Sequence, residues 1–126
     1  FRSDHLIKAG FPHERILICH RGFNPGHDPN PFKFRNLPNF EMALRLKEKL
    51  GCPMIIDPSH IGGSPDNVLR TIIEAEEYPF DGYMIEVHPH VNFAKTDQKQ
   101  QLDITQFKGI INRLFGSLTS NGASKG

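Results

Sequence analysis

The sequence lacks tryptophan, has only two cysteines and two tyrosines, and contains no hydrophobic run that approaches the span of a bilayer. Cys19 and Cys52 each lie inside an apolar run, which is typical of reduced thiols in the core and not of a secreted disulfide framework. The opening residues, FRSDHLIKAG, have neither the basic cluster nor the apolar stretch of a signal peptide. These absences predict a cytoplasmic protein.

An excess of charge of one sign is also missing. The chain has 15 Lys and Arg against 14 Asp and Glu, so its formal net charge is +1. Because such a chain has no overall field to attract a nucleic acid or an anionic membrane, we expect neither as a partner. With 126 residues, 37% of them hydrophobic, the chain suits a single globular domain in which any anion is bound by a local site.

Short runs of strand-forming residues alternate with longer amphipathic segments, a pattern typical of βαβ units and a parallel sheet. The three strands are expected at residues 15–20, 53–57 and 80–87. The middle run, PMIID, is apolar throughout, as in parallel strands that are covered on both faces. The predicted class is therefore α/β.

Three helices are expected between and after these strands. The segment PNFEMALRLKEKLG has an apolar stripe and ends at Gly51. Ser64 and Pro65 suit the N-cap and first turn of a second helix. Its predicted buried face comprises Val68, Leu69, Ile72 and Ile73. A last helix is expected to reach about residue 118, and the small polar residues 119–126 predict a flexible tail or linker.

Residues that can do chemistry follow each predicted strand. Arg21 follows the first strand, Asp57 and His60 follow the second, and Glu86 and His88 lie at the end of the third. In parallel α/β folds, and above all in (β/α)₈ barrels, active sites are assembled at this carboxyl edge. We therefore expect one site built from three separated segments.

The chain is too short for a complete barrel. A (β/α)₈ barrel takes about 250 residues, and three parallel strands with helices on one side leave the other face open to water. We expect either the C-terminal portion of a larger TIM barrel, of about three βα units, or a chain that associates with others.

His60, Glu86 and Asp97 are residue types that bind first-row divalent metals. An alternative from spacing alone is that His60 caps a helix, Glu86 pairs with Arg21, and Asp97 is a solvated loop residue. Spacing and composition by themselves favour this second interpretation.

Five motifs favour the metal-binding interpretation instead: HRGF, FRNLP, DPSHIGG, MIEVHP and AKTDQKQQL. Their order and spacing resemble the C-terminal half of 3-deoxy-D-arabino-heptulosonate 7-phosphate synthase (DAHP synthase), of the shorter microbial type that is sometimes fused to chorismate mutase. The resemblance runs from about Lys8 to Phe115 and rests on the combination, since any one motif alone would be weak.

The resemblance implies that His60, Glu86 and Asp97 are three of four ligands to a divalent cation of the Mn, Fe, Zn or Co type. It also implies that Arg21 grips the phosphate of phosphoenolpyruvate, a role that suits a planar, permanently charged guanidinium. Arg35 either lines the phosphoenolpyruvate pocket or caps the next helix. Arg21 and His60 are thus the candidate catalytic residues, and Arg21 and Arg35 the candidate substrate-binding residues.

The implied reaction joins phosphoenolpyruvate to erythrose 4-phosphate and releases phosphate, in the first step of the shikimate pathway to aromatic amino acids. The family's fourth ligand, a cysteine early in the barrel, has no counterpart here, because Cys19 and Cys52 lie in predicted core runs. We therefore expect this chain alone to be inactive and to require the N-terminal half of the barrel or a homo-oligomer, with a chorismate mutase as a possible fused or associated partner.

Two other functions remain open at this point. The sister 3-deoxy-octulosonate 8-phosphate synthase shares the EVHP region, although its preceding strand usually ends in a D-x-T-H form instead of DPSH. A non-catalytic barrel remnant that binds a partner through its open sheet face is the third interpretation.

Overall fold

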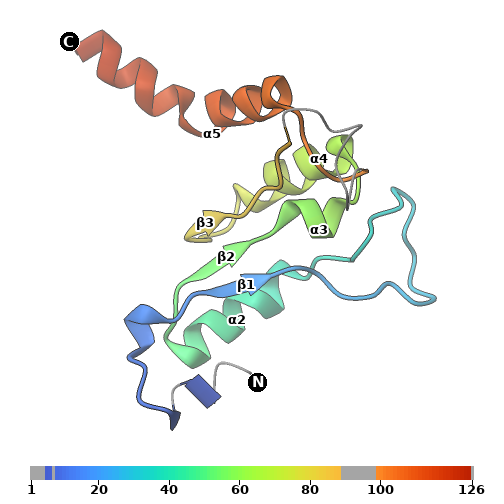
Figure 1. Ribbon diagram of the computed structural model, residues 1–126, viewed down its shortest axis with the longest axis vertical. Helices are drawn as coiled ribbons and strands as arrows, with labels where there is room; N and C mark the ends of the chain where they lie inside the picture. The colour runs from blue at the N-terminus through green and yellow to red at the C-terminus, as the bar shows by residue number, and fades with distance from the viewer. Residues whose placement is uncertain (1–4, 7, 89–98, 126) are drawn as a thin grey trace.

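A computed structural model describes residues 5–6, 8–88 and 99–125 of the chain, with 117–125 described as backbone only (Figure 1). The elements, in chain order, are a 3₁₀ turn η1 (His13–Arg15), β1 (Ile18–His20), α2 (Phe40–Leu50), β2 (Met54–Ile56), α3 (Pro58–Gly62), α4 (Pro65–Ala75), β3 (Gly82–Tyr83) and α5 (Ile104–Lys125). None of the described helices is both long enough and apolar enough to span a membrane.

The strands form one parallel sheet in the order β1-β2-β3. Ile55 of β2 is the register partner of Cys19 on one side and of Gly82 on the other. This confirms the predicted α/β class. The observed strands are shorter than the expected runs. Before β1, residues 13–15 form η1. After β3, the chain pairs with neighbouring segments only through single contacts. One of these joins the Met84 amide to the Ile56 carbonyl, 2.9 Å away.

The crossover helices begin and end at the residues that the sequence indicated. Asn39 caps α2 by accepting from the Met42 amide at 3.0 Å, and Gly51 ends it with a φ of 64°. Ser64 caps α4 by accepting from the Asn67 amide, and Pro65 occupies the first turn. Sequence signals therefore located both helices closely.

Two segments differ from expectation. The DPSHIGG segment contains a helix that was not among the three expected: Pro58–Gly62 form the short helix α3, with Asp57 as its N-cap and Gly63, at φ 75°, as its end. At the other end of the chain, α5 continues to Lys125 and so includes most of the 119–126 segment expected as a flexible tail or linker. No proline interrupts α5, so nothing in that segment forces the helix to stop.

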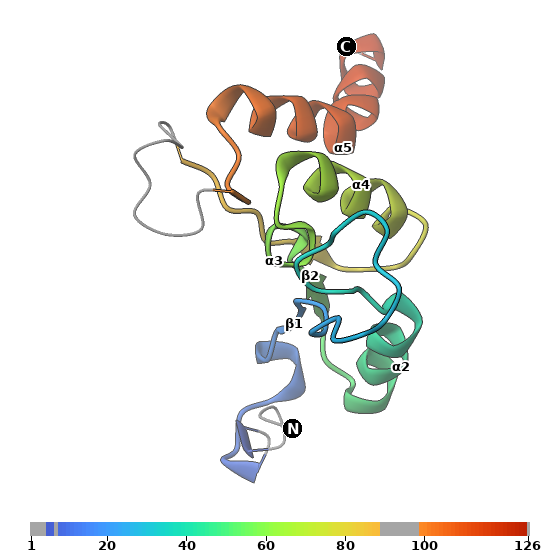
Figure 2. The same cartoon turned by 90° about the vertical axis from the view of Figure 1, so that its right-hand side faces the viewer.

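Helices α2 and α4 lie on the same side of the sheet, as Figure 2 shows. One core cluster joins Phe40 of α2 to Ile56 of β2 and Ala75 of α4. A second joins Val68 and Ile72 of α4 to Leu102 and to Ile110 of α5.

The predicted buried face of α4 was half wrong. Leu69 and Ile73 are about two-fifths exposed, whereas Val68 and Ile72 are fully buried. Successive helical residues are rotated by about 100°, so the apolar pair at 69 and 73 lies to one side of the sheet-facing stripe.

The opposite face of the sheet is open in the described chain. Cys19 and Ile55 point away from the helix layer, since side chains alternate along a strand and Ile56 packs against α2. Leu17 and Met84, which flank β1 and β3, are 58% and 50% exposed. The strands thus present an apolar surface that parallel sheets normally cover.

Candidate metal and phosphate site

The carboxyl ends of the three strands bring together side chains from four segments. Arg21 follows β1 directly, Asp57 follows β2, and Glu86 lies on the extended chain after β3. His60 reaches the same edge from α3, and Gln100 reaches it from the segment that leads to α5. This is the edge where the sequence predicted a site.

Asp57 fixes the imidazole of His60. One carboxylate oxygen, Oδ1, accepts the His60 amide at 3.0 Å as the cap of α3, and the other, Oδ2, lies 2.6 Å from His60 Nδ1. The Asp57 side chain is only 2% exposed, so both oxygens depend on protein partners. The Asp57 carboxylate therefore holds both the backbone and the ring of His60 in place.

The other ring nitrogen of His60 faces Glu86. His60 Nε2 lies 3.2 Å from Glu86 Oε1. A proton on Nδ1, donated to Asp57, leaves the Nε2 lone pair directed at a carboxylate oxygen. Two acceptors cannot stabilise each other, so this arrangement requires a positive charge between them: a proton on Nε2 or a metal cation.

Glu86 is held by contacts with Ser59, Gln100 and His60. Its backbone amide donates to Ser59 Oγ at 2.9 Å, and its Oε1 accepts from Gln100 Nε2 at 3.1 Å. Its second oxygen, Oε2, is buried and has no hydrogen-bond partner within the part of the chain that the structure describes. A buried carboxylate oxygen without a donor is costly. Together with His60 Nε2, this oxygen forms a donor set that fits a divalent cation.

The loop that carries Arg35 is fastened to α3. The Arg35 and Asn36 amides donate to the Gly62 and Ile61 carbonyls, at 3.3 and 3.1 Å, and Asn36 Nδ2 donates to the His60 carbonyl at 2.8 Å. The Arg35 guanidinium donates to Gln100 Oε1. Arg35 therefore reaches the cluster from a loop that is fixed to α3.

Asn67 of α4 holds the same loop from behind. Its side-chain amide donates to the Phe32 carbonyl at 2.8 Å and to the Gly62 carbonyl at 3.3 Å. Asn67 is 6% exposed, so these bonds are shielded from water. The loop after β1 is thus anchored at residues 32–36.

Arg21 contacts the cluster at its edge. Its Nε lies 3.7 Å from Asp57 Oδ2, and its side chain is 58% exposed. The alternative pairing of Arg21 with Glu86 is not among the contacts of the described residues. Arg21 therefore presents most of its donors to solvent, where an anionic ligand can reach them.

The neighbours of Arg21 on β1 are uncharged. Burial lowers the pKa of His20, whose Nε2 accepts from the Asn39 amide at 3.0 Å. Burial, with the nearby Asp57 carboxylate, raises the pKa of the Cys19 thiol to about 11. Cys19 is therefore a protonated thiol at neutral pH, but it is only partly buried and lies on the open face of the sheet, so the prediction that both cysteines are core thiols holds in the described chain for Cys52 alone.

Of the three predicted metal ligands, His60 and Glu86 converge, and Asp97 lies outside the described residues. No group of three or more His, Cys, Asp or Glu side chains with metal-site geometry occurs within the described ranges. The backbone amide of His88 donates to the Leu102 carbonyl at 2.9 Å.

Sequence reasoning missed Gln100 and the role of Ser59. Both are buried, at 1% and 0% exposure. Ser59 Oγ accepts the Glu86 amide. Gln100 stands in a polar run, KQQ, with no periodic signal to separate it from its neighbours.

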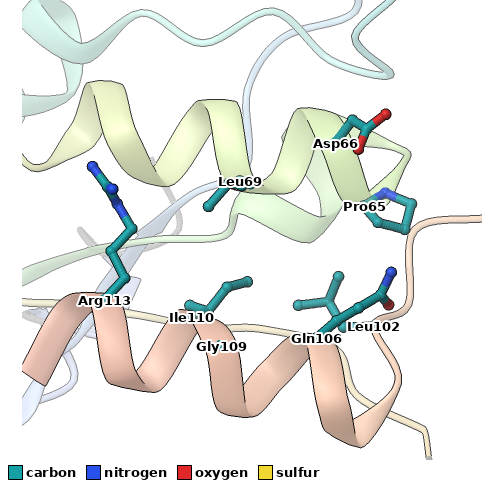
Figure 3. A pocket seen from close by; sticks show the side chains of 8 residues that line it. All are labelled: Pro65, Asp66, Leu69, Leu102, Gln106, Gly109, Ile110 and Arg113. Carbon is teal, nitrogen blue, oxygen red and sulfur yellow. The ribbon is translucent and has the colours of Figure 1, made fainter. Parts of the chain in front are cut away.

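A separate cavity of about 370 Å³ lies between α4 and α5. Leu69 and Ile110 project into it from the two helices, with Asp66 at one end and Arg113 at the other (Figure 3). Arg113 is paired with Glu76, whose Oε1 lies 3.1 Å from the Arg113 Nε. The cavity shares no lining residue with the cluster around His60, so it is not part of the candidate site.

Known proteins with this architecture were found in sequence and in structure. The chain is 29% identical to a phospho-2-dehydro-3-deoxyheptonate aldolase of Thermotoga maritima over 112 residues, which cover 89% of this chain and 31% of that protein. It is 25% identical to a 2-dehydro-3-deoxyphosphooctonate aldolase of Actinobacillus pleuropneumoniae, over 80% of this chain and 37% of that protein.

The crystal structure of the Thermotoga maritima DAHP synthase superimposes with a TM-score of 0.72 at 28% identity, covering 85% of this chain and 30% of that one. A truncated form of the synthase from the same organism gives a TM-score of 0.79 at 26% identity, covering 95% of this chain and 44% of that one. The chain thus spans less than half the length of these relatives, and its fold is a portion of their TIM barrel, as predicted.

The family match accounts for both the motifs and the cluster at the strand ends. It extends over residues 3–118, nearly the whole chain, and it includes every segment that contributes to the site. On this match, the chain belongs to the DAHP synthetase I family.

Proposed function

We propose that this chain forms the last three βα units of a DAHP synthase, which condenses phosphoenolpyruvate with erythrose 4-phosphate. The observation that carries the proposal is the line of contacts Asp57–His60–Glu86 at the carboxyl edge of the sheet, with Glu86 Oε2 left without a donor among the described residues. Family membership and the DAHP synthase relatives support it.

The arginines at this edge are the proposed anion-binding groups. Arg21 is largely exposed beside Asp57, and Arg35 reaches the cluster from a loop that is fastened to α3. Guanidinium groups hold phosphate and carboxylate oxygens through paired N–H donors. Two phosphorylated substrates held in this way would have their reacting carbons brought together, which removes much of the entropic cost of a two-substrate reaction.

His60 Nε2 and Glu86 Oε2, with Asp97, are the proposed ligands of a divalent cation. When bound, such a cation supplies Lewis-acid polarisation of the sugar aldehyde. Asp57 holds the His60 ring with Nε2 directed toward Glu86, as acids behind metal-binding histidines do. The third carbon of phosphoenolpyruvate forms a bond to the aldehyde carbon, water adds to the second carbon, and phosphate leaves.

The remaining barrel units are the proposed partner of the open sheet face. On this face, the side chains of Leu17 and Met84 are at least half exposed. In the described chain, β1 and β3 are the edge strands of the sheet, and the outer edge of each has no strand paired to it. Strands that continue the sheet from these edges would close the barrel and cover the face.

Synthesis of 3-deoxy-octulosonate 8-phosphate is the second candidate, because octulosonate-phosphate aldolases are among the relatives. The two reactions share phosphoenolpyruvate and differ in the sugar phosphate. The same metal and phosphate groups would serve both, so the choice depends on the length of the sugar that the complete site accepts.

A chimaeric enzyme, here called the joined barrel, tests the function. In it, this chain replaces the matching C-terminal segment of the truncated Thermotoga maritima synthase, with which it aligns over 95% of its length. Phosphate release is measured with phosphoenolpyruvate and either erythrose 4-phosphate or arabinose 5-phosphate, with the parent enzyme as control. We expect turnover with the four-carbon sugar and none from the chain alone; turnover only with the pentose would identify the second candidate.

A further inference from the structure

Gln100 occupies a fixed position beside Glu86. The Leu102 amide donates to the Glu86 carbonyl at 3.0 Å, and the Leu102 carbonyl accepts from the His88 amide at 2.9 Å, which makes Val87 and Leu102 parallel partners. Leu102 is itself 1% exposed in the core cluster of α4 and α5. Gln100, two residues earlier, is thus held against the strand end by backbone pairing.

The side-chain amide of Gln100 has only one orientation that satisfies its neighbours. Gln100 is 1% exposed, and its Oε1 accepts from the Arg35 guanidinium while its Nε2 donates to Glu86 Oε1 at 3.1 Å. A guanidinium can only donate and a carboxylate can only accept. A residue between them must do both, which an amide does and a carboxylate, an ammonium or an alkyl group does not.

This bond determines which oxygen of Glu86 remains for a cation. Gln100 Nε2 and His60 Nε2 both lie next to Oε1, while Oε2 has no donor among the described residues. Without the Gln100 amide, the carboxylate is free to rotate and to form a closer pair with His60, which would occupy both proposed ligands.

We propose that Gln100 is a positioning residue that couples the anion-binding side of the site, at Arg35, to the metal-binding side, at Glu86. The inference rests on the proposed metal site. It predicts that Arg35 changes metal affinity through its contact with Gln100, whose amide in turn donates to Glu86. Groups behind metal ligands typically change metal affinity about 10- to 100-fold when they are removed.

The test is a titration of the chain with Mn²⁺ in the absence of substrates. Electron paramagnetic resonance measures the free Mn²⁺ at each step. The titration is then repeated with the joined barrel. Gln100→Met keeps the side-chain length and removes both hydrogen bonds, and we expect it to weaken Mn²⁺ binding about 10- to 100-fold. Arg35→Met should weaken it in the same direction. The loss in the double variant should be smaller than the sum of the two single losses, because both changes break the contact between Arg35 and Gln100.

Gln106→Met is the matched control. At the start of α5, Gln106 Oε1 accepts the Asp103 amide at 3.0 Å, while the Gln106 backbone amide donates to Asp103 Oδ1 at 2.7 Å, so this change removes one side-chain hydrogen bond without touching Glu86. We expect its Mn²⁺ affinity to equal that of the unmodified chain. If Gln106→Met and Gln100→Met have equal urea midpoints and lose equal amounts of Mn²⁺ affinity, the role of Gln100 is structural and the proposal is wrong.

Two further outcomes separate this inference from the metal site itself. If His60→Ala abolishes Mn²⁺ binding while Gln100→Met and Arg35→Met leave it unchanged, the coupling is wrong and the site stands. If none of the three changes binding, the metal site is wrong and the inference falls with it. Arg35 is exposed, so Arg35→Met keeps the test decisive if Gln100→Met fails to fold.

Discussion

His60 Nδ1 lies 2.6 Å from Asp57 Oδ2, and the same aspartate caps the helix that carries His60. One buried carboxylate therefore sets both the position of the backbone and the orientation of the ring. The two functions can be separated by substitution, because an asparagine is as good a helix cap as an aspartate but differs in what it offers a ring nitrogen.

Asp57→Asn should weaken metal binding without loss of the helix. Its carbonyl oxygen can still accept the His60 amide, but its NH₂ group would then face Nδ1, which would have to become an acceptor. The proton would move to Nε2, the proposed metal-binding nitrogen, and Mn²⁺ affinity should fall about 10- to 100-fold. Titration with Mn²⁺ and urea unfolding of the same samples measure the two effects.

Asp57→Ala serves as the comparison for that change. It removes the cap as well as the ring partner, so it should also lower the free energy of unfolding by about 1 kcal/mol. An Asp57→Asn protein that binds Mn²⁺ as well as the unmodified chain would show that the ring orientation does not matter to the cation.

Arg21→Lys in the joined barrel should impair use of phosphoenolpyruvate although the positive charge is kept. A lysine offers a point charge in place of paired N–H donors, and a hydrogen bond to a charged group is worth about 1.5–3 kcal/mol. We expect kcat/KM for phosphoenolpyruvate to fall about ten- to a hundred-fold. The parallel measurement with Lys33→Arg, a change at another basic residue of the same loop, is the control; unchanged kinetics for Arg21→Lys would remove Arg21 from the phosphate site.

The sequence predicted the location of the site better than its local structure. Each strand ends next to a residue that can do chemistry, so Arg21, Asp57 and Glu86 were assigned to one edge from the α/β pattern alone. The helix α3 was missed because Pro58 and the two glycines of HIGG are typical of a loop. In retrospect, Asp57 followed by Pro58 is a helix start, although α3 is too short for its apolar residues to show a period.

Gln100 could not have been found by the same reasoning. Its importance comes from a contact with Glu86, 14 residues earlier, and another with Arg35, 65 residues earlier. Nothing in the local sequence distinguishes it from the Gln101 beside it. Pairwise contacts of this kind depend on the register between Val87 and Leu102, which the sequence pattern did not indicate.

Asp81 should make stability depend on pH through the loop before β3. Its Oδ2 accepts the Met54 amide at 2.7 Å and lies 3.1 Å from Lys47 Nζ; the Met54 amide, more than Lys47, lowers the pKa of Asp81 below its ordinary 3.8. A lowered pKa stabilises the folded state above about pH 3.8, and this stabilisation is lost as the pH falls through the folded-state value.

Asp81→Asn keeps an acceptor for the Met54 amide and removes the charge. At neutral pH we expect it to lower the free energy of unfolding by less than about 1 kcal/mol, because the Asp81 and Lys47 side chains are partly exposed. Urea unfolding of both proteins should show this deficit at about pH 6 and a smaller deficit at about pH 3, below the ordinary pKa of Asp81. A deficit of the same size at both pH values would mean that the Asp81 charge contributes nothing.

In the proposed site, His60 Nε2 and Glu86 Oε2 hold a divalent cation. The measurement that tests it most directly is a crystal structure of the joined barrel soaked with Mn²⁺, with anomalous scattering recorded at the manganese edge and His60→Ala crystals treated in the same way. We predict one strong anomalous peak within coordination distance of His60 Nε2 and Glu86 Oε2, absent from the His60→Ala crystals. A peak bound elsewhere, or one that persists unchanged without the His60 imidazole, would contradict the account.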